Sequence, residues 1–166
     1  LPATLFVDFH RTGTRTKYQR EFGQLRRGLG ELALAECFEN QGRFLDALLD
    51  KAWQLCHLHS WELPAHTPGL LPPGEYDTDL VAADIARELG LLVQVLGKQL
   101  HPVLVKQIRH EVYVRVLDPF ADPESRYGWE KSIHNWNSVC ISGVLGAALA
   151  LESGMETGAE REMLCA

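Results

Sequence analysis

Apolar residues recur every three or four positions along most of the chain, the spacing typical of amphipathic α-helices. This pattern predicts five helices, and the first turns of a sixth from Thr157 onward. The five apolar stripes run over Phe22–Cys37, Leu45–Cys56, Val81–Leu96, Leu104–Val116 and Val139–Leu151. No segment predicts a strand. We therefore expect an all-α protein.

Local signals predict where the helices begin and end. Asn40-Gln41-Gly42 ends the first helix, because glycine tolerates the left-handed backbone found at helix C-termini. Asp77 or Thr78 offers the N-cap of the third helix. Pro102 suits the first turn of the fourth helix, where its missing N–H would have no partner in any case. Asp118-Pro119 predicts the end of that helix.

The predicted helices form antiparallel pairs. Short turns join the members of a pair at Asn40–Arg43, Gly97–Pro102 and Ser153–Gly158, whereas long loops join successive pairs at Pro64–Gly74 and Phe120–His134. The pairs recur about every 55 to 60 residues, and such repeats stack into a superhelix or a closed toroid. Both long loops should lie on the same side of the stack, and long loops are where sites are usually built.

Two and a half pairs are too few to close a ring. The chain starts at Leu1-Pro2 and stops at Cys165-Ala166, within a helical pattern. We therefore expect residues 1–166 to be a single, incomplete (α/α) toroid domain, a fragment whose natural partner is the remainder of a longer parent chain.

Composition and charge narrow the possible partners. With 46% hydrophobic and 23% charged residues, the chain is ordinary for a soluble domain. No apolar run approaches the ~20 residues that cross a bilayer, so no membrane partner is expected. The net charge of −6 disfavours nucleic acid as a partner. No segment directs the chain to a compartment, so a cytoplasmic and a periplasmic or secreted location both stay open.

Basic residues nevertheless crowd the first 27 positions. They are Arg11, Arg15, Lys17, Arg20, Arg26 and Arg27. Such a cluster is either a solvated helix face or a surface that attracts an anionic sugar chain.

The cysteines and glycines favour structural roles. Cys37, Cys56, Cys140 and Cys165 form no CxxC pair, and three of them occupy apolar helical positions, which predicts reduced core residues. His57 and His59 would point apart on a helix, so no metal or other cofactor is expected. Gly143 and Gly146 predict close helix packing. Three carboxylates near the third helix are better explained by capping than by catalysis; they are Asp77, Asp79 and Asp84.

Candidate chemistry gathers in the two long loops. The first loop opens with Trp61-Glu62-Leu63-Pro64-Ala65-His66, and the second ends with His134-Asn135-Trp136-Asn137. An indole can stack on the C–H face of a sugar ring, while imidazoles and amides hydrogen-bond its rim. Each residue also has a structural alternative. Trp61 could plug the end of the second helix, His66 could cap its loop, and Asn135 or Asn137 could be the N-cap of the fifth helix.

Five segments of the chain resemble the heparinase II/III-like family of polysaccharide lyases. They are Leu1–Leu5, Phe9–Gly13, Gly42–Ala47, Trp61–His66 and Asn135–Cys140, of which the last two are the more specific. The resemblance implies an N-terminal (α/α) toroid that precedes β-sheet domains, with the substrate cleft between them. It also implies β-elimination on uronic-acid-containing polysaccharides, with an acidic polysaccharide or oligosaccharide as the ligand.

The resemblance assigns roles to particular residues. Asn135, or as second choice His134, would neutralise the uronate carboxylate as charge develops on it during elimination. The residues expected to bind substrate are Trp61, Glu62, His66, Trp136 and Asn137. The family's catalytic tyrosine and later histidine would fall beyond Ala166, so the fragment alone should lack lyase activity.

Two other functions stay open. A non-catalytic helical-repeat scaffold would disperse Trp61, His66 and Asn135, or bury them as structural plugs. A glycoside hydrolase on a similar helical barrel would need two carboxylates facing each other across a groove, with Glu62 as the first candidate.

Overall fold

The computed structural model describes residues 1–166 except 73, 123, 125–126 and 154–166. The described residues form helices and no strand, which confirms the all-α prediction. In chain order the helices are α1 (Ala3–Thr12), α2 (Thr16–Arg26), α3 (Leu29–Glu39), α4 (Leu45–Cys56), α5 (Leu80–Leu96), α6 (Pro102–Val112), a π-helical turn (Tyr113–Leu117), α7 (Asp118–Ala121), a 3₁₀ turn (Gly128–Lys131) and α8 (Trp136–Ser153).

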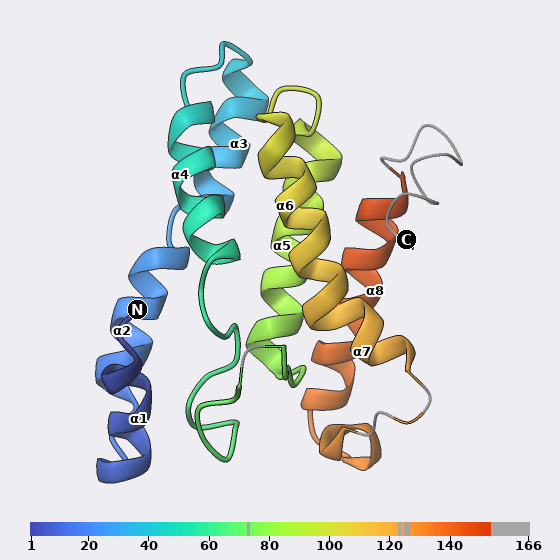
Figure 1. The fold of residues 1–166 in the computed structure, drawn as a ribbon. Helices are drawn as coiled ribbons and strands as arrows, with labels where there is room; N and C mark the ends of the chain where they lie inside the picture. Colours follow the sequence, from blue (N-terminus) through green and yellow to red (C-terminus); the bar gives the residue numbers. More distant parts are fainter. Residues whose placement is uncertain (73, 123, 125–126, 154–166) are drawn as a thin grey trace.

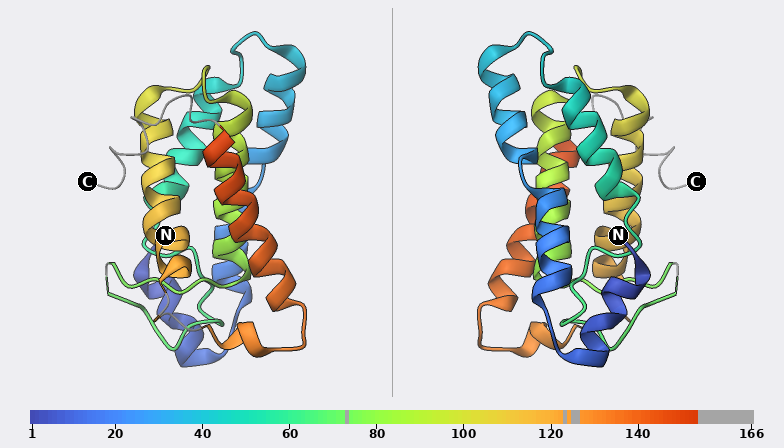
Figure 2. Two further views of the ribbon diagram at one scale, coloured as in Figure 1. Left: turned by 90° about the vertical axis from the view of Figure 1, so that its right-hand side faces the viewer. Right: turned by 90° about the vertical axis from the view of Figure 1, so that its left-hand side faces the viewer.

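The helices lie in two layers. Helices α3, α5 and α8 run side by side in one layer, and α4 and α6 run in the opposite direction in the other (Figures 1 and 2). Helix α5 contacts α3, α6 and α8, so it lies at the centre of the stack. Its buried residues accordingly include Ile85, Leu89, Leu92 and Leu96. A stack of antiparallel helix pairs is therefore present in the described residues.

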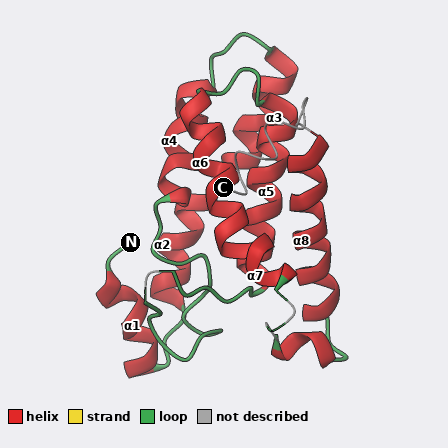
Figure 3. Ribbon diagram, turned by 45° about the vertical axis from the view of Figure 1, so that its right-hand side comes forward, coloured by secondary structure: helices red, strands yellow, loops and turns green. Residues whose placement is uncertain are grey.

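The short turns and the long loops occupy opposite ends of this stack. The turns from α3 to α4 and from α5 to α6 lie at the top of Figure 1, and the described parts of the loops 57–79 and 122–135 lie at the bottom. Figure 3 shows the same segregation in a second view. The expected placement of short turns and long loops at opposite ends is thus correct for the described residues, and residues far apart in sequence meet at one end.

The N-terminal part of the fold differs from the prediction in two ways. The stripe Phe22–Cys37 predicted one helix, but Arg27 adopts an extended backbone and Gly28 a left-handed one, with φ 87°, so the helix breaks into α2 and α3. Helix α1 was not predicted at all. It packs through Phe6, whose ring meets that of Tyr18 edge-on at 5.3 Å between centroids.

The turn between α3 and α4 is held by a buried carboxylate. Asn40 takes the left-handed C-cap position with φ 51°, and Gly42 follows with φ 78°. Glu36 accepts hydrogen bonds from the backbone N–H of Gly42 at 2.6 Å and of Phe44 at 3.0 Å. These backbone donors hold the pKa of Glu36 below its ordinary value, the bond from Phe44 contributing most. The predicted helix end is correct, and a side chain from the preceding helix fixes the turn.

Glycines bring α5 and α8 into close contact, as the Gly143 and Gly146 pair predicted. A β-carbon added at Gly143 would lie 2.7 Å from the carbonyl oxygen of Ala83. At Gly90, on the facing helix, an added β-carbon would lie 3.3 Å from the Cα of Ala147. The backbones of the two helices therefore approach more closely than side chains would allow.

The fourth predicted helix extends past its expected end. Pro102 occupies its first turn, as predicted, but Asp118-Pro119 does not terminate it. The helix widens into the π-helical turn and continues through α7, and Pro119, which has no N–H to donate, lies two residues after this turn. The helix expected from Thr157 onward, and the turn Ser153–Gly158, lie outside the described residues apart from Ser153 itself.

Candidate functional site

Aromatic rings join the two long loops. His66 lies in the first long loop, and Trp136 begins α8 directly after the second. Their ring centroids are 4.7 Å apart, with the planes at 65°. His134 contacts the same indole, at 6.1 Å between centroids. We call His66, His134 and Trp136 the Trp136 cluster. It brings together residues from both of the sequence segments in which candidate chemistry was expected.

Two asparagines flank Trp136 at the start of α8. Asn135 is exposed, and its backbone C=O accepts a hydrogen bond from the N–H of Val139 at 3.0 Å, so Asn135 occupies the N-cap position. This cap uses the backbone and does not occupy the carboxamide of Asn135. Asn137 is half-buried, and its Nδ2 donates to the C=O of Glu130 at 2.9 Å. Asn135 is thus both an N-cap and an exposed neighbour of the Trp136 cluster.

Asp79 anchors the first loop to α5. Its Oδ1 accepts hydrogen bonds from the N–H groups of Val81 at 2.8 Å and Ala82 at 2.7 Å, which makes Asp79 the N-cap of α5 in place of the predicted Asp77 or Thr78. Its Oδ2 lies 3.1 Å from the N–H of Leu63 and 2.6 Å from Nδ1 of His66. Asp79 is 2% exposed, so one buried carboxylate starts a helix and holds the imidazole of His66.

Trp61 cannot stack on a sugar in this structure, which corrects its expected role. The residue is 1% exposed, and its indole N–H donates to the C=O of Leu55 at 2.9 Å. The guanidinium of Arg115 lies over its ring, 5.1 Å from the centroid. The structural alternative, in which Trp61 plugs the end of the second predicted helix, describes this position.

Glu62 is also inaccessible, which corrects its assignment as a substrate-binding residue. It is 2% exposed, its carboxylate accepts from the hydroxyl of Ser60, and its Oε1 accepts from the N–H of Asp77 at 2.9 Å. Burial raises the pKa of Glu62 above its ordinary value. Burial also raises the pKa of Tyr18, and the charge of Glu62 adds to that shift. Glu62 was the first candidate for a catalytic carboxylate of a glycoside hydrolase, and its burial keeps it from facing a substrate groove.

Arg115, which sequence reasoning missed, caps the C-terminus of α4. Its guanidinium donates to the carbonyl oxygens of Leu58 at 2.9 Å and His59 at 3.2 Å, and its Nε donates to Glu111 at 2.5 Å. Only 6% of Arg115 is exposed, and it also lies over the ring of Tyr76. The π-helical turn contains this residue. A lone arginine in an apolar stripe was the one available sequence signal.

Half of the six residues in the N-terminal basic cluster are paired with carboxylates. Lys17 bonds to Asp8, Arg20 bonds to Glu21, and Arg26 bridges Asp84 and Glu88 at 2.8 Å each. Asp84 bonds to Arg87 as well, and these arginine partners hold the pKa of Asp84 below its ordinary value despite its partial burial.

Arg15 is the basic residue that approaches the first long loop. It lines a small hollow together with Pro64 and Ala65, which directly precede His66. Its guanidinium also lies over the ring of Phe9, 5.9 Å from the centroid. Lys17, Arg20 and Arg26 have acidic partners, whereas Arg15 lies beside the first long loop, so Arg15 is the member of the cluster that these contacts connect with the candidate site.

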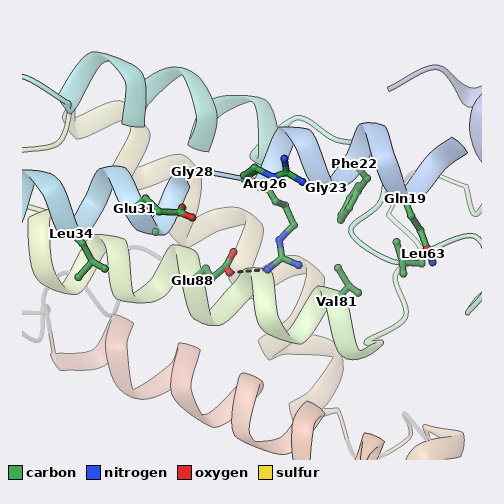
Figure 4. A pocket seen from close by; sticks show the side chains of 12 residues that line it. Gln19, Phe22, Gly23, Arg26, Gly28, Glu31, Leu34, Leu63, Val81 and Glu88 are labelled. Carbon is green, nitrogen blue, oxygen red and sulfur yellow. Dashed lines mark ion pairs between the residues drawn. The ribbon is translucent and has the colours of Figure 1, made fainter. Parts of the chain in front are cut away.

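A groove of about 830 Å³ lies where α2 and α3 meet α5 (Figure 4). Leu34, Leu63 and Val81 contribute its apolar lining, and the Arg26–Glu88 ion pair spans it. No histidine lines this groove, so its chemistry is separate from that of the Trp136 cluster.

The described residues offer no group of three or more ligands that could hold a metal ion. His57 and His59 bond to different carbonyl oxygens, those of Trp53 and Leu71, at 2.8 and 2.7 Å. Cys56 and Cys140 are buried free thiols, as expected. Cys37 is exposed, which corrects its assignment to the core, and Cys165 lies outside the described residues.

No helix within the described part of the chain is long and apolar enough to cross a membrane. No protein-family model matches the chain, and no curated protein matches it with significant similarity. The likeness to heparinase II/III-like lyases therefore consists of the sequence motifs alone.

Proposed function

We propose that this chain forms part of the substrate cleft of a polysaccharide lyase that cleaves uronic-acid-containing polysaccharides by β-elimination. The observation that carries the proposal is the contact of His66 and His134, from different long loops, with the single indole of Trp136. Both motif segments of highest specificity for the heparinase II/III-like family contribute to this cluster. The same proposal includes that the chain belongs to this family and that its fold is an incomplete (α/α) toroid.

The chemistry of the cluster suits an acidic sugar. A half-buried indole offers an apolar surface for the C–H face of a pyranose, and the imidazoles and the exposed carboxamide of Asn135 supply hydrogen bonds to its rim. Elimination begins with loss of the proton at the carbon next to the uronate carboxylate, so the charge that develops on that carboxylate must be stabilised. Asn135 and His134 are the residues proposed to do so. Under this proposal the base and the acid come from residues beyond position 166.

Binding to the chain itself tests the first half of the proposal. We would titrate residues 1–166 with alginate and heparin oligosaccharides and with a neutral maltohexaose, and measure affinity by calorimetry. The acidic oligosaccharides should bind, and Asn135→Ala and Trp136→Ala should each weaken binding. Ile133→Ser is the matched control, because Ile133 is fully exposed in the same loop and should leave affinity unchanged. Equal affinities for all variants, or binding of none of the acidic sugars, would refute the proposal.

Elimination itself needs a second assay. A protein that contains this segment and the residues proposed to follow it should release an unsaturated uronate, followed by its ultraviolet absorbance. Asn135→Ala should lower kcat, because the interaction is strongest in the transition state. Undiminished turnover in that variant would remove Asn135 from the proposed role.

A helical-repeat scaffold for a protein partner is the second candidate. Large apolar side chains are exposed on α3 and α8, including Phe38 at 89% and Leu149 at 68%. Trp61 is also buried, as the scaffold hypothesis expects. This candidate predicts that substitutions at Phe38 and Leu149 alter association, whereas substitutions in the Trp136 cluster do not.

A further inference from the structure

The hydrogen bonds around the Trp136 cluster determine which nitrogen of each imidazole carries the proton. Asp79 is already an acceptor for three backbone N–H groups, those of Leu63, Val81 and Ala82. Both carboxylate oxygens of Asp79 accept N–H groups, so Asp79 acts as a hydrogen-bond acceptor toward His66 as well. Nδ1 of His66, 2.6 Å from Oδ2, must therefore carry a hydrogen. In the neutral imidazole this leaves the lone pair on Nε2.

The second imidazole of the cluster has the opposite arrangement. The backbone N–H of Trp136 can only donate, and it points to Nδ1 of His134 at 3.3 Å. The hydroxyl of Ser132 lies 3.3 Å from the same nitrogen but donates its hydrogen to the C=O of Trp129 at 2.7 Å, so the assignment depends on the Trp136 N–H. Nδ1 of His134 is therefore the acceptor, and in the neutral ring the hydrogen is on Nε2. The two imidazoles contact one indole but offer different groups, a lone pair from His66 and an N–H from His134.

Neither Nε2 atom has a hydrogen-bond partner among the described residues. His134 is an exposed residue, and Nε2 of the half-buried His66 is not a fully buried, unpartnered atom, so both rings are open to solvent. His66 is held by Asp79, which is itself fixed at the N-terminus of α5. The lone pair of His66 is thus presented by a rigid element and not by a free loop.

We propose that the Trp136 cluster distinguishes the two kinds of polar group on a uronate: His134 donates its Nε2–H to the carboxylate, and His66 accepts a sugar hydroxyl at Nε2. Asp79 is the positioning residue that sets the tautomer of His66. This inference rests on the proposed function and deepens it, since it assigns a part of the substrate to each ring. A carboxylate next to the lone pair of His66 would be repelled, so the orientation of the bound sugar is fixed.

The tautomers can be read directly by NMR. Long-range ¹H–¹⁵N correlation spectra of the ¹⁵N-labelled chain, recorded well above pH ~6.5 where histidines are ordinarily neutral, distinguish the two forms. We expect the Nδ1–H form for His66 and the Nε2–H form for His134. The opposite assignment of His66 would overturn the proposal without any ligand or substitution.

The Asp79→Asn variant tests the positioning role. The amide oxygen can still cap α5, but the NH₂ group takes the place of Oδ2 and donates to Nδ1 of His66, so the ring should switch to the Nε2–H form. Asp77→Asn is the matched control, because it removes the same charge two positions away without contacting His66. An unchanged tautomer in a folded Asp79→Asn protein would overturn the proposal. If that variant does not fold, the tautomers of the native chain and the binding of His66→Ala still decide.

Carboxyl-reduced oligosaccharides distinguish the proposed roles of His66 and His134. They keep the hydroxyls of the uronate and lose its charge. Alginate oligosaccharides should shift the Nε2 signals of both histidines, and the carboxyl-reduced form should shift only that of His66. His66→Ala and Asp79→Asn should each weaken alginate binding by up to about tenfold, the range of one neutral hydrogen bond. Full-strength binding by both variants would refute this inference and leave the uronate-binding function intact. Absence of any uronate binding would refute the proposed function, and with it the assignment of sugar groups to the two rings.

Discussion

The close contact of α5 and α8 makes a quantitative prediction for Gly143→Ala. Three atoms of Ala83 would lie 2.7 to 2.8 Å from the new β-carbon, and two of them belong to the backbone. Backbone atoms cannot rotate away, so the two helices must separate. Overpacking of this kind costs about 1 to 3 kcal/mol, and the backbone contact favours the upper end of that range.

A favourable effect opposes this cost. Alanine is about 1 kcal/mol better than glycine inside a helix. The net loss in the free energy of unfolding should therefore be about 2 kcal/mol. For a chain of this size 1 kcal/mol corresponds to roughly 2 to 4 °C in Tm, so Gly143→Ala should melt roughly 4 to 8 °C lower.

Gly23→Ala is the matched control. Gly23 is inside α2, and a β-carbon there would meet nothing within 4 Å. Only the helix-propensity gain remains, so this variant should melt roughly 2 to 4 °C higher than the native chain. Thermal unfolding followed by circular dichroism measures both. The packing argument fails if Gly143→Ala is as stable as the native chain or more so while Gly23→Ala shows its expected gain.

Two further predictions concern buried charges. Arg115→Met should lower the free energy of unfolding, measured by urea titration, by about 3 kcal/mol or more, because it leaves Glu111 and the carbonyl oxygens at the end of α4 without their donor. Adding Glu111→Leu to this variant should recover part of the lost stability. No recovery in the double variant would contradict this explanation. Burial raises the pKa of Glu62, so the folded state binds the Glu62 proton more tightly than the unfolded state does. The contribution of Glu62 to stability is therefore greatest below its unfolded-state pKa of 4.5, and it declines as the pH rises through the folded-state pKa. Glu62→Gln should remove that decline, and identical pH dependence of unfolding for both proteins would show that Glu62 does not cause it.

Local sequence patterns predicted most of the helices. The apolar stripes of α4, α5 and α6 keep the helical spacing over many residues, so local pattern and tertiary packing both favour helices there. The break at Gly28 escaped prediction because the apolar spacing continues on both sides of it, although its left-handed backbone is a common reason for glycine. Helix α1 escaped because few of its residues are buried, so it has no long apolar stripe.

The candidate site was predicted in part. The alternation of short turns and long loops placed His66 and Trp136 at the same end, and this needed only the topology of the helix pairs. The burial of Trp61 and Glu62 could not be predicted in the same way, because Arg115 arrives from a helix more than fifty positions away. The bond from Asp79 to His66 depends likewise on how a loop folds back on the helix that follows it.

The direction of α8 has an electrostatic consequence at the loop end of the molecule. Helix α8 begins beside His134, and no acidic residue occupies its first turn. At α5 the partial positive charge of the helix N-terminus is met by the carboxylate of Asp79, whereas at α8 the corresponding charge of about +0.5 faces the exposed Asn135. The field of the peptide dipoles therefore favours an anion there, although the chain as a whole carries a net charge of −6.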